Sequence, residues 1–158
     1  MAFLVIARGD GVVPVSFIID RRPATRAAVD ELGTELALEL QFEEGILAAH
    51  GFEELLIDRI LQIPDSLGPI SEDGEEVFRF RVNIVTMSVS LDEADDDGET
   101  AEDVETRFNE MIIYLTLDRD ITGTSDLREI EQLTLRSLQD KGYVIGYVSV
   151  QSFLPLSG

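Results

Sequence analysis

The sequence predicts an α+β fold: a mostly antiparallel sheet with two to three helices on one face, one long β-hairpin with an acidic tip, and a C-terminal β-α-β unit. Two β-rich runs, 77–91 and 111–117, flank a mostly acidic insert at 92–105, and this pattern predicts the long hairpin. A helical apolar period after Thr124 and a further β-rich run over 143–154 predict the β-α-β unit. The length of 158 residues suits a single domain.

The N-terminal segment predicts a β-hairpin. Phe3–Ala7 and Val12–Ile19 are β-rich runs, and Asp10-Gly11 between them favours the positive φ angles of a tight turn. Pro14 cannot donate a hydrogen bond to a neighbouring strand. It therefore predicts that the second strand lies at a sheet edge or carries a bulge.

Residues 23–42 fit two interpretations. In the first, a helix begins at Pro23 and ends at Gly33. A half-buried strand then follows, with alternating apolar residues at Leu36, Leu38, Leu40 and Phe42. In the second, one helix runs from about residue 24 through this segment, because leucine and glutamate are good helix formers.

A helix is predicted over 52–63. Its apolar residues recur at helical spacing, as Phe52, Leu56, Ile60 and Ile63. Pro64 ends the segment. Residues 64–76 are rich in proline, glycine, serine and acidic residues, so they predict a loop.

Residues 77–91 form the clearest predicted strand. Apolar and polar side chains alternate, and the alternation then shifts by one residue, which predicts a bulge near Val85–Thr86. The expected partner strand, 111–117, carries apolar residues on both faces. Ile112 and Tyr114 on its second face predict that this strand is covered on both sides or lies in an interface.

The acidic insert matches a calcium-binding loop only in part. Its alternating carboxylates predict loose attraction of cations at Glu93, Asp95, Asp97 and Glu99. Val104 stands where a calcium loop places its bidentate acid, so no specific metal site is predicted. A short helix is expected over 100–109.

The last helix is expected to begin at a cap provided by Thr124 or Ser125. Its buried face is expected to carry Leu127, Ile130, Leu133 and Leu138. Lys141 lies in its last turn and Gly142 at its end, as the helix dipole and the C-cap rules favour.

The charge of the chain is its strongest compositional signal. It carries 32 acidic and 12 basic residues, a net charge of −20, with carboxylates spread over most of its length. Self-repulsion of this kind costs stability at low ionic strength, and the cost falls near ~1 M salt, where the Debye length is ~3 Å. The composition therefore predicts adaptation to high salt, and a basic partner protein is the alternative explanation. No stripe of lysine and arginine is present to displace counterions, so nucleic-acid binding is not expected.

Several classes of site are not expected. The chain has no cysteine, which excludes disulfides, thiolate metal sites and cysteine nucleophiles. His50 is the only histidine, and no Gly-x-Ser-x-Gly motif accompanies it, which argues against a serine-hydrolase triad. No apolar run approaches the ~18–20 residues that span a bilayer. Residues 1–7 lack the positive region of a secretory signal, so secretion by this route and a membrane partner are not expected.

These features favour a non-enzymatic structural or assembly subunit without cofactor or catalytic residues. Protein partners are expected, above all in a homo-oligomer, and a ring is possible. The candidate interface consists of Ile112, Tyr114, Arg79 and Arg81. A small regulatory or ligand-binding domain is the first alternative, and an enzyme that uses carboxylates or a metal is the second.

The order of elements over 52–154 is a helix, a long β-hairpin and a β-α-β unit. This order resembles that of the small neck and tail-completion, or tail terminator-like, proteins of tailed viruses. The resemblance implies a ring-forming subunit at a head–tail joint or tail end, adapted here to a halophilic host. It also implies a location in the virion or the cytoplasm. The N-terminal hairpin departs from the pattern.

Overall fold

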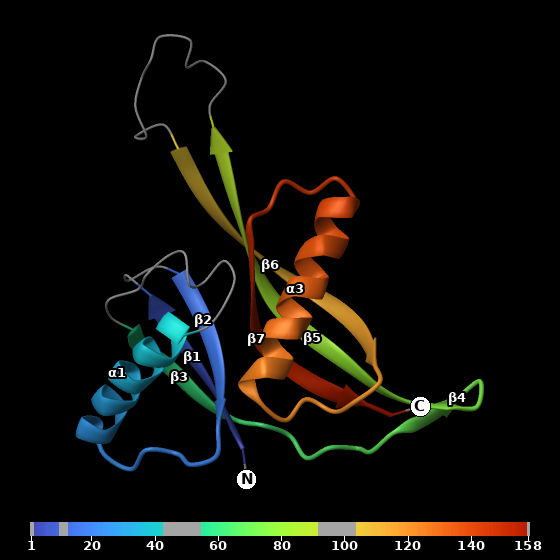
Figure 1. Cartoon of the computed structure of the whole chain (residues 1–158), viewed down its shortest axis with the longest axis horizontal. Helices are drawn as coiled ribbons and strands as arrows, with labels where there is room; N and C mark the ends of the chain where they lie inside the picture. Colours follow the sequence, from blue (N-terminus) through green and yellow to red (C-terminus); the bar gives the residue numbers. More distant parts are fainter. Residues whose placement is uncertain (1, 10–12, 43–54, 92–103, 158) are drawn as a thin grey trace.

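The computed structural model describes residues 2–9, 13–42, 55–91 and 104–157 (Figure 1). The chain has the predicted α+β fold with mostly antiparallel pairing, but its strands form two sheets rather than one. The elements along the chain are β1 (Phe3–Gly9), β2 (Val13–Ile19), α1 (Arg26–Phe42), β3 (Leu55–Gln62), β4 (Ile70–Glu72), β5 (Glu75–Leu91), β6 (Val104–Leu117), α3 (Thr124–Asp140) and β7 (Tyr147–Leu156). The helices are divided between the two sheets, so the single helix-covered face that we expected is replaced by two.

The first two strands form the predicted hairpin in the short sheet, which has the order β2-β1-β3. β1 and β2 pair antiparallel, from Phe3 opposite Ile19 to Gly9 opposite Val13. β2 lies at the edge of the sheet, as Pro14 predicted. The predicted Asp-Gly turn at residues 10–11 lies outside the described residues.

The helix predicted over 52–63 is wrong for its described part, because residues 55–62 form the strand β3, which pairs with β1. Asp58 is an extra residue in this pairing, so the register shifts at that point. The shift places Ile57 and Ile60, which are three positions apart, against the same core. The helix prediction instead paired Ile60 with Leu56, which is 62% exposed.

Residues 26–42 form one helix, α1, so the helix-plus-strand interpretation is wrong and the single-helix interpretation is correct. Its buried residues have helical spacing: Leu36, Ala37 and Leu40. A half-buried strand would have buried Leu38 together with Leu36 and Leu40, but Leu38 is exposed.

Gly33 lies inside α1 instead of ending it. A Cβ atom at this position would come 2.6 Å from the carbonyl oxygen of Leu55. The glycine is therefore required because α1 packs closely against the backbone of β3.

The long sheet is built around β5. This strand pairs antiparallel with β6 over 78–91 and with β7 over 79–87. β6 and β7 therefore run parallel to each other with β5 between them, and α3 connects them as the predicted β-α-β unit. Beyond Met87, β5 and β6 continue as a two-stranded arm that projects from the body of the molecule (Figure 1).

The loop predicted over 64–76 ends in a short hairpin that the prediction missed. β4 pairs with the first residues of β5, and Asp73 and Gly74 connect them. Their φ angles are 51° and 83°. Positive φ at both positions is the tight-turn conformation that Asp-Gly favours.

The bulge predicted near Val85–Thr86 lies in the neighbouring strand instead. The β5–β6 register has no shift, and Thr86 is buried. The β5–β7 register shifts next to Ile84, where Gln151 is the extra residue of β7. Met87 interrupts the alternation because it packs against the core of the short sheet.

Two further predictions near the arm and α3 are corrected. The helix expected over 100–109 is absent from its described part, because residues 104–109 belong to β6. α3 has Gly123 as its N-cap, rather than Thr124 or Ser125. The carboxylate of Asp126 accepts hydrogen bonds from the backbone N–H groups that precede the helix.

The buried face of α3 contains three of the four predicted residues, Leu127, Ile130 and Leu138. The fourth, Leu133, is exposed. Lys141 is the C-cap residue, and Gly142 follows with a φ of 96°, as predicted for the end of this helix.

Two hydrophobic cores share the strand β1. Val5 and Ala7 belong to the core between the short sheet and α1. Leu4 and Ile6 point to the opposite face and belong to the core between the long sheet and α3. β1 is therefore covered on both faces and holds the two sheets together.

Side chains of α3 and β7 cover the outer edge of β2. Three carbonyl oxygens at alternate positions accept hydrogen bonds from side chains: Pro14 from Tyr147, Ser16 from Arg128 and Ile18 from Thr124. The hydroxyl of Thr124 also accepts a hydrogen bond from the N–H of Ile18 at 3.0 Å. An edge whose backbone groups are bonded in this way is protected from pairing with another strand.

Candidate protein–protein interface

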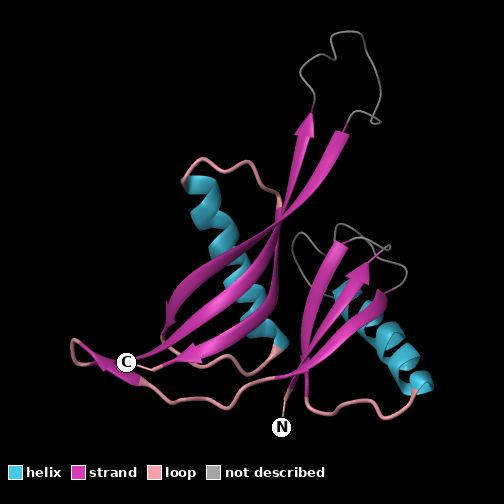
Figure 2. Ribbon diagram, turned by 180° about the vertical axis from the view of Figure 1, so that it is seen from behind, coloured by secondary structure: helices cyan, strands magenta, loops and turns pink. Residues whose placement is uncertain are grey.

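One face of the long sheet packs against α3, and no described helix covers the other face, which we call the outer face (Figure 2). The strand registers arrange the outer face in rows that cross β6, β5 and β7 in turn. The two central rows are Tyr114–Arg81–Leu154 and Ile112–Asn83–Ser152. A third row places Thr116, Arg79 and Leu156 beside them.

All four predicted interface residues lie on the outer face. Arg79 and Arg81 are two positions apart on β5, and Ile112 and Tyr114 are two positions apart on β6. Tyr114 is 70% exposed and Ile112 is 50% exposed. No described element of the same copy covers these side chains, so the expectation that both faces of β6 are covered within one copy is not met by the described residues. The expectation of an interface stays a prediction.

The two arginines have different surroundings. Arg79 forms an ion pair with Glu72 at 2.5 Å. Arg81 forms no ion pair with any described residue and lies between Tyr114 and Leu154. A planar guanidinium can stack on aromatic rings and bind carboxylates through two parallel hydrogen bonds, so Arg81 is suited to contact a partner.

Leu154, which is 48% exposed, also lies on the outer face and was missed as a candidate interface residue from the sequence. The sequence did contain a signal for it. Val148 and Val150 are buried and lie two positions apart, as on one face of a strand, but the next buried residue, Phe153, lies three positions after Val150. This odd spacing indicates an extra residue between them, which is Gln151. Beyond that bulge, Leu154 must lie on the outer face.

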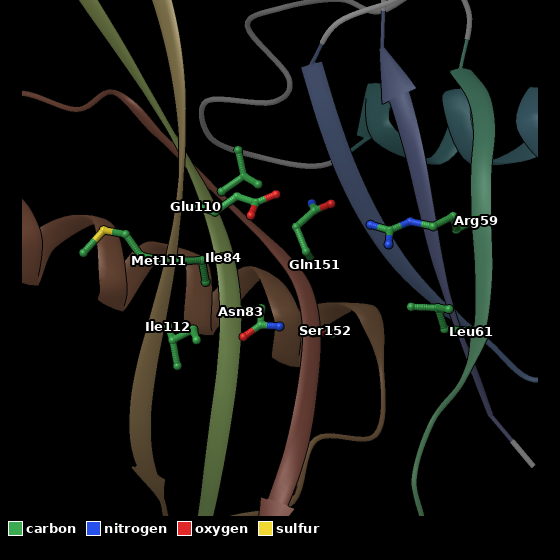
Figure 3. A pocket seen from close by; sticks show the side chains of 10 residues that line it. Arg59, Leu61, Asn83, Ile84, Glu110, Met111, Ile112, Gln151 and Ser152 are labelled. Atoms are coloured by element: carbon green, nitrogen blue, oxygen red, sulfur yellow. The ribbon is translucent and has the colours of Figure 1, made fainter.

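A groove of about 580 Å³ separates the outer face from β3 (Figure 3). Arg59 and Leu61 line it on the β3 side, and the long sheet contributes Asn83, Val85, Glu110, Ile112, Gln151 and Ser152. Arg59 points across the groove toward Gln151 (Figure 3) and has no ion-pair partner among the described residues. The helix predicted over 52–63 did not place Arg59 beside the long sheet, so Arg59 is not among the residues predicted from the sequence.

The other candidate residues give no site. The cation-attracting carboxylates Glu93, Asp95, Asp97 and Glu99, and also His50, lie outside the described residues. In the described part of the chain, no three histidine or acidic side chains gather in a way that could hold a metal ion. None of the described helices is both long and apolar enough to cross a membrane.

No protein-family model, curated protein or solved structure matches the chain. The outer face and its groove are therefore the basis for a functional proposal.

Proposed function

We propose that this protein is a non-enzymatic structural subunit that assembles with further copies of itself through the outer face of the long sheet. The row Tyr114–Arg81–Leu154 is the observation that carries this proposal. Two exposed apolar side chains there flank an arginine that no described carboxylate neutralises. Exposed apolar residues that gather on one face, rather than scatter singly, are typical of interaction sites.

The charge distribution supports a second copy as the partner. The chain has a net charge of −20, so most surfaces of two copies repel each other. Arg81 on the outer face and Arg59 across the groove are two cations without a described ion partner. The outer face is therefore a region where a carboxylate of another copy is attracted and not repelled.

The arm formed by β5 and β6 beyond Met87 also favours assembly. A two-stranded ribbon has few neighbours to pack against and is only marginally stable by itself in water. Contacts with another copy would stabilise the arm.

A finer form of the proposal is a neck or tail-completion protein of a tailed virus, adapted to high salt. The order of a long hairpin followed by a β-α-β unit supports it. The strand β3, which stands where that order has a helix, does not support it. This form therefore rests on fewer elements than the assembly role itself.

Light scattering after size exclusion, in ~2 M and ~0.15 M salt, tests the assembly role because screening of exposed charges differs greatly between them. We expect a discrete oligomer in high salt and a smaller species in low salt. A single mass equal to one chain under both conditions would refute the proposal.

Two matched variants connect the oligomer to the outer face. Leu154→Asp places a carboxylate in the central row, and we expect it to reduce the mass in high salt. Val144→Asp adds the same charge at a position that is 80% exposed in the loop between α3 and β7, and we expect no change. Equal behaviour of the two variants would exclude the outer face as the contact.

The groove favours a second candidate function, a small regulatory or ligand-binding domain. Arg59 could bind a carboxylate group of a small molecule while Leu61 and Ile112 contact its apolar part. A panel of small organic carboxylates should then raise the melting temperature of the wild type but not of Arg59→Ser. An unchanged melting temperature across the panel would remove this candidate.

A further inference from the structure

We infer that two copies of the chain join edge to edge along β6, as an antiparallel pair centred on Tyr114. This inference rests on the proposed assembly function and adds a second contact, at the edge of the long sheet beside the outer face. β6 pairs with β5 on one side and with no described strand on its other side. Unpaired backbone groups along such an edge are a template for another strand.

Two of the sheet edges, those of β2 and β6, differ in the features that block pairing. The edge of β2 contains Pro14, and side chains of α3 and β7 bond to its carbonyl oxygens. Residues 108–117 of β6 contain no proline and no lysine, and their pairing with β5 has no register shift. Proteins use these devices to prevent edge-to-edge association, so their absence over 108–117 leaves this edge of β6 open to association.

The core beneath β6 is incomplete in one copy. The side chains on the α3 face of β6 are only partly buried, namely Met111, Ile113, Leu115 and Leu117. On the same face of β5, Phe80, Val82 and Ile84 are at most 1% exposed. A strand added beside β6 would bury the remaining apolar surface of this row.

The sequence of β6 fixes the register of the pair. Residues 111–117 carry no charge, and Tyr114 is the middle residue of this run. A two-fold axis at Tyr114 places Ile113 opposite Leu115 and Met111 opposite Leu117 of the second copy on the α3 face, and Ile112 opposite Thr116 on the outer face, so no charged residue meets this run. Any shift of the register would place a carboxylate against this run.

The same register explains why the pair needs salt. It places Glu110 opposite Asp118 of the second copy at each end of the paired run. Like charges directly opposite each other destabilise a strand pair, and salt screens them. The pair is therefore expected to form in high salt and to dissociate as the salt is removed.

Single cysteines test this contact directly, because the natural chain contains none. Residues directly opposite in an antiparallel pair have Cβ atoms about 4.5–5.5 Å apart, which is close to the separation in a disulfide. In ~2 M salt with a mild oxidant, we expect Tyr114→Cys to form a covalent dimer. Tyr143→Cys, at a residue that is 52% exposed in a loop, is the control and should stay monomeric on a non-reducing gel.

A mixing experiment tests the register. Ile112 should lie opposite Thr116 of the second copy, so an equimolar mixture of Ile112→Cys and Thr116→Cys should cross-link. Each variant alone should not, because its two copies are four positions out of register, about 13 Å along the strand. These variants also test the contact independently if Tyr114→Cys folds poorly.

The outcomes separate the two proposals. If an oligomer is present in high salt but neither Tyr114→Cys nor the mixture cross-links more than Tyr143→Cys, the β6 contact is wrong and the assembly function stands. If the wild type is a monomer in high salt, both are wrong. We expect Tyr114→Cys and the mixture to cross-link. We expect no cross-link when Ile112→Cys or Thr116→Cys is oxidised alone.

Discussion

The carboxylate of Glu131 on α3 accepts a hydrogen bond from the backbone N–H of Val150 on β7 at 2.9 Å. The same carboxylate accepts a hydrogen bond from the hydroxyl of Ser16 on β2 at 3.4 Å and pairs with Arg128 at 3.0 Å. Arg128 donates to the carbonyl oxygen of Ser16 at 2.7 Å, and its guanidinium lies 5.1 Å from the centre of the Phe17 ring. One buried ion pair on α3 is thus bonded to strands of both sheets.

Replacement of Glu131 by alanine should destabilise the protein strongly. It leaves Arg128 without its carboxylate in a largely buried place and removes the acceptor of the Val150 N–H. Loss of one partner of a buried pair costs about 3–5 kcal/mol. Urea unfolding at constant salt measures this change. Glu129→Ala, which removes an exposed partner of Arg119, is the control and should cost less than about 1 kcal/mol.

Replacement of Thr134 by valine should stabilise the protein. The Thr134 hydroxyl is buried on α3 and has no hydrogen-bond partner among the described groups. A buried polar group without a partner carries a penalty of about 1–3 kcal/mol, and valine has nearly the same shape. We expect a gain of about 1 kcal/mol in the free energy of unfolding. A loss of stability would mean that the hydroxyl has a partner after all, and Ser137→Ala on the exposed face controls for the change in the helix.

Gly33→Ala should destabilise the protein, although alanine is the better helix former. In an open helix this substitution gains about 1 kcal/mol. Here the new Cβ would come 2.6 Å from the Leu55 carbonyl oxygen, and the backbone of β3 would have to move. We expect a net cost of about 1–3 kcal/mol by denaturant unfolding. Thr34→Ala, at the exposed neighbouring position, should change stability by no more than about 0.5 kcal/mol.

The stability should fall in acid partly through Asp126. Burial alone would raise its pKa, but hydrogen bonds from Thr122 and Gly123 and the nearby Arg119 outweigh burial, and the pKa lies below its ordinary value of 3.8. A lowered pKa in the folded state means that the ionised group stabilises the fold above the unfolded pKa of ~3.9. This contribution is lost as the pH falls through the folded pKa.

Asp126→Asn should therefore be less stable than the wild type at pH ~7, and the difference should shrink below pH ~4. Urea unfolding at several pH values measures the difference. Asp140→Asn, at the exposed opposite end of α3, controls for the loss of one negative charge. A difference that stays constant with pH would show that Asp126 acts through its shape and not its charge.

Salt should stabilise the folded chain itself. The net charge of −20 acts through repulsion between exposed carboxylates, and screening reduces this repulsion. We expect the urea midpoint to rise steadily from ~0.05 M to 2 M potassium chloride. Equal midpoints at both ends of this range would contradict the interpretation of the acidic composition as an adaptation to salt.

The sequence predicted the elements whose alternation is regular. β1 and β2 are β-rich runs separated by a turn signal, β5 alternates regularly over 78–84, and three of the four predicted residues of α3 are buried, so local pattern was sufficient for these elements. The prediction failed where one residue breaks the alternation of a strand or the pattern of a helix because of a contact with another element. Asp58 and Gln151 are extra residues opposite β1 and β5, and Gly33 is required by contact with β3.

The candidate interface followed the same rule. Ile112 and Tyr114 could be predicted, because apolar residues on both faces of a strand are visible in the sequence. The place of Leu154 depends on the bulge in β7, which the shift between Val150 and Phe153 indicates, whereas Arg59 could not be placed without the bulge in β3. The groove joins residues of both sheets, so no local pattern could indicate it.

The covered edge of β2 also has a consequence for the order of folding during synthesis. The groups that bond to the Pro14, Ser16 and Ile18 carbonyl oxygens lie 133, 112 and 106 positions further along the chain. Ribosomes add about 5–20 residues per second, so the first hairpin waits for seconds before α3 and β7 emerge. During this interval its edge is open to other nascent chains. The hairpin that is made first is therefore completed last, and the yield of native protein should depend on what shields that edge in the cell.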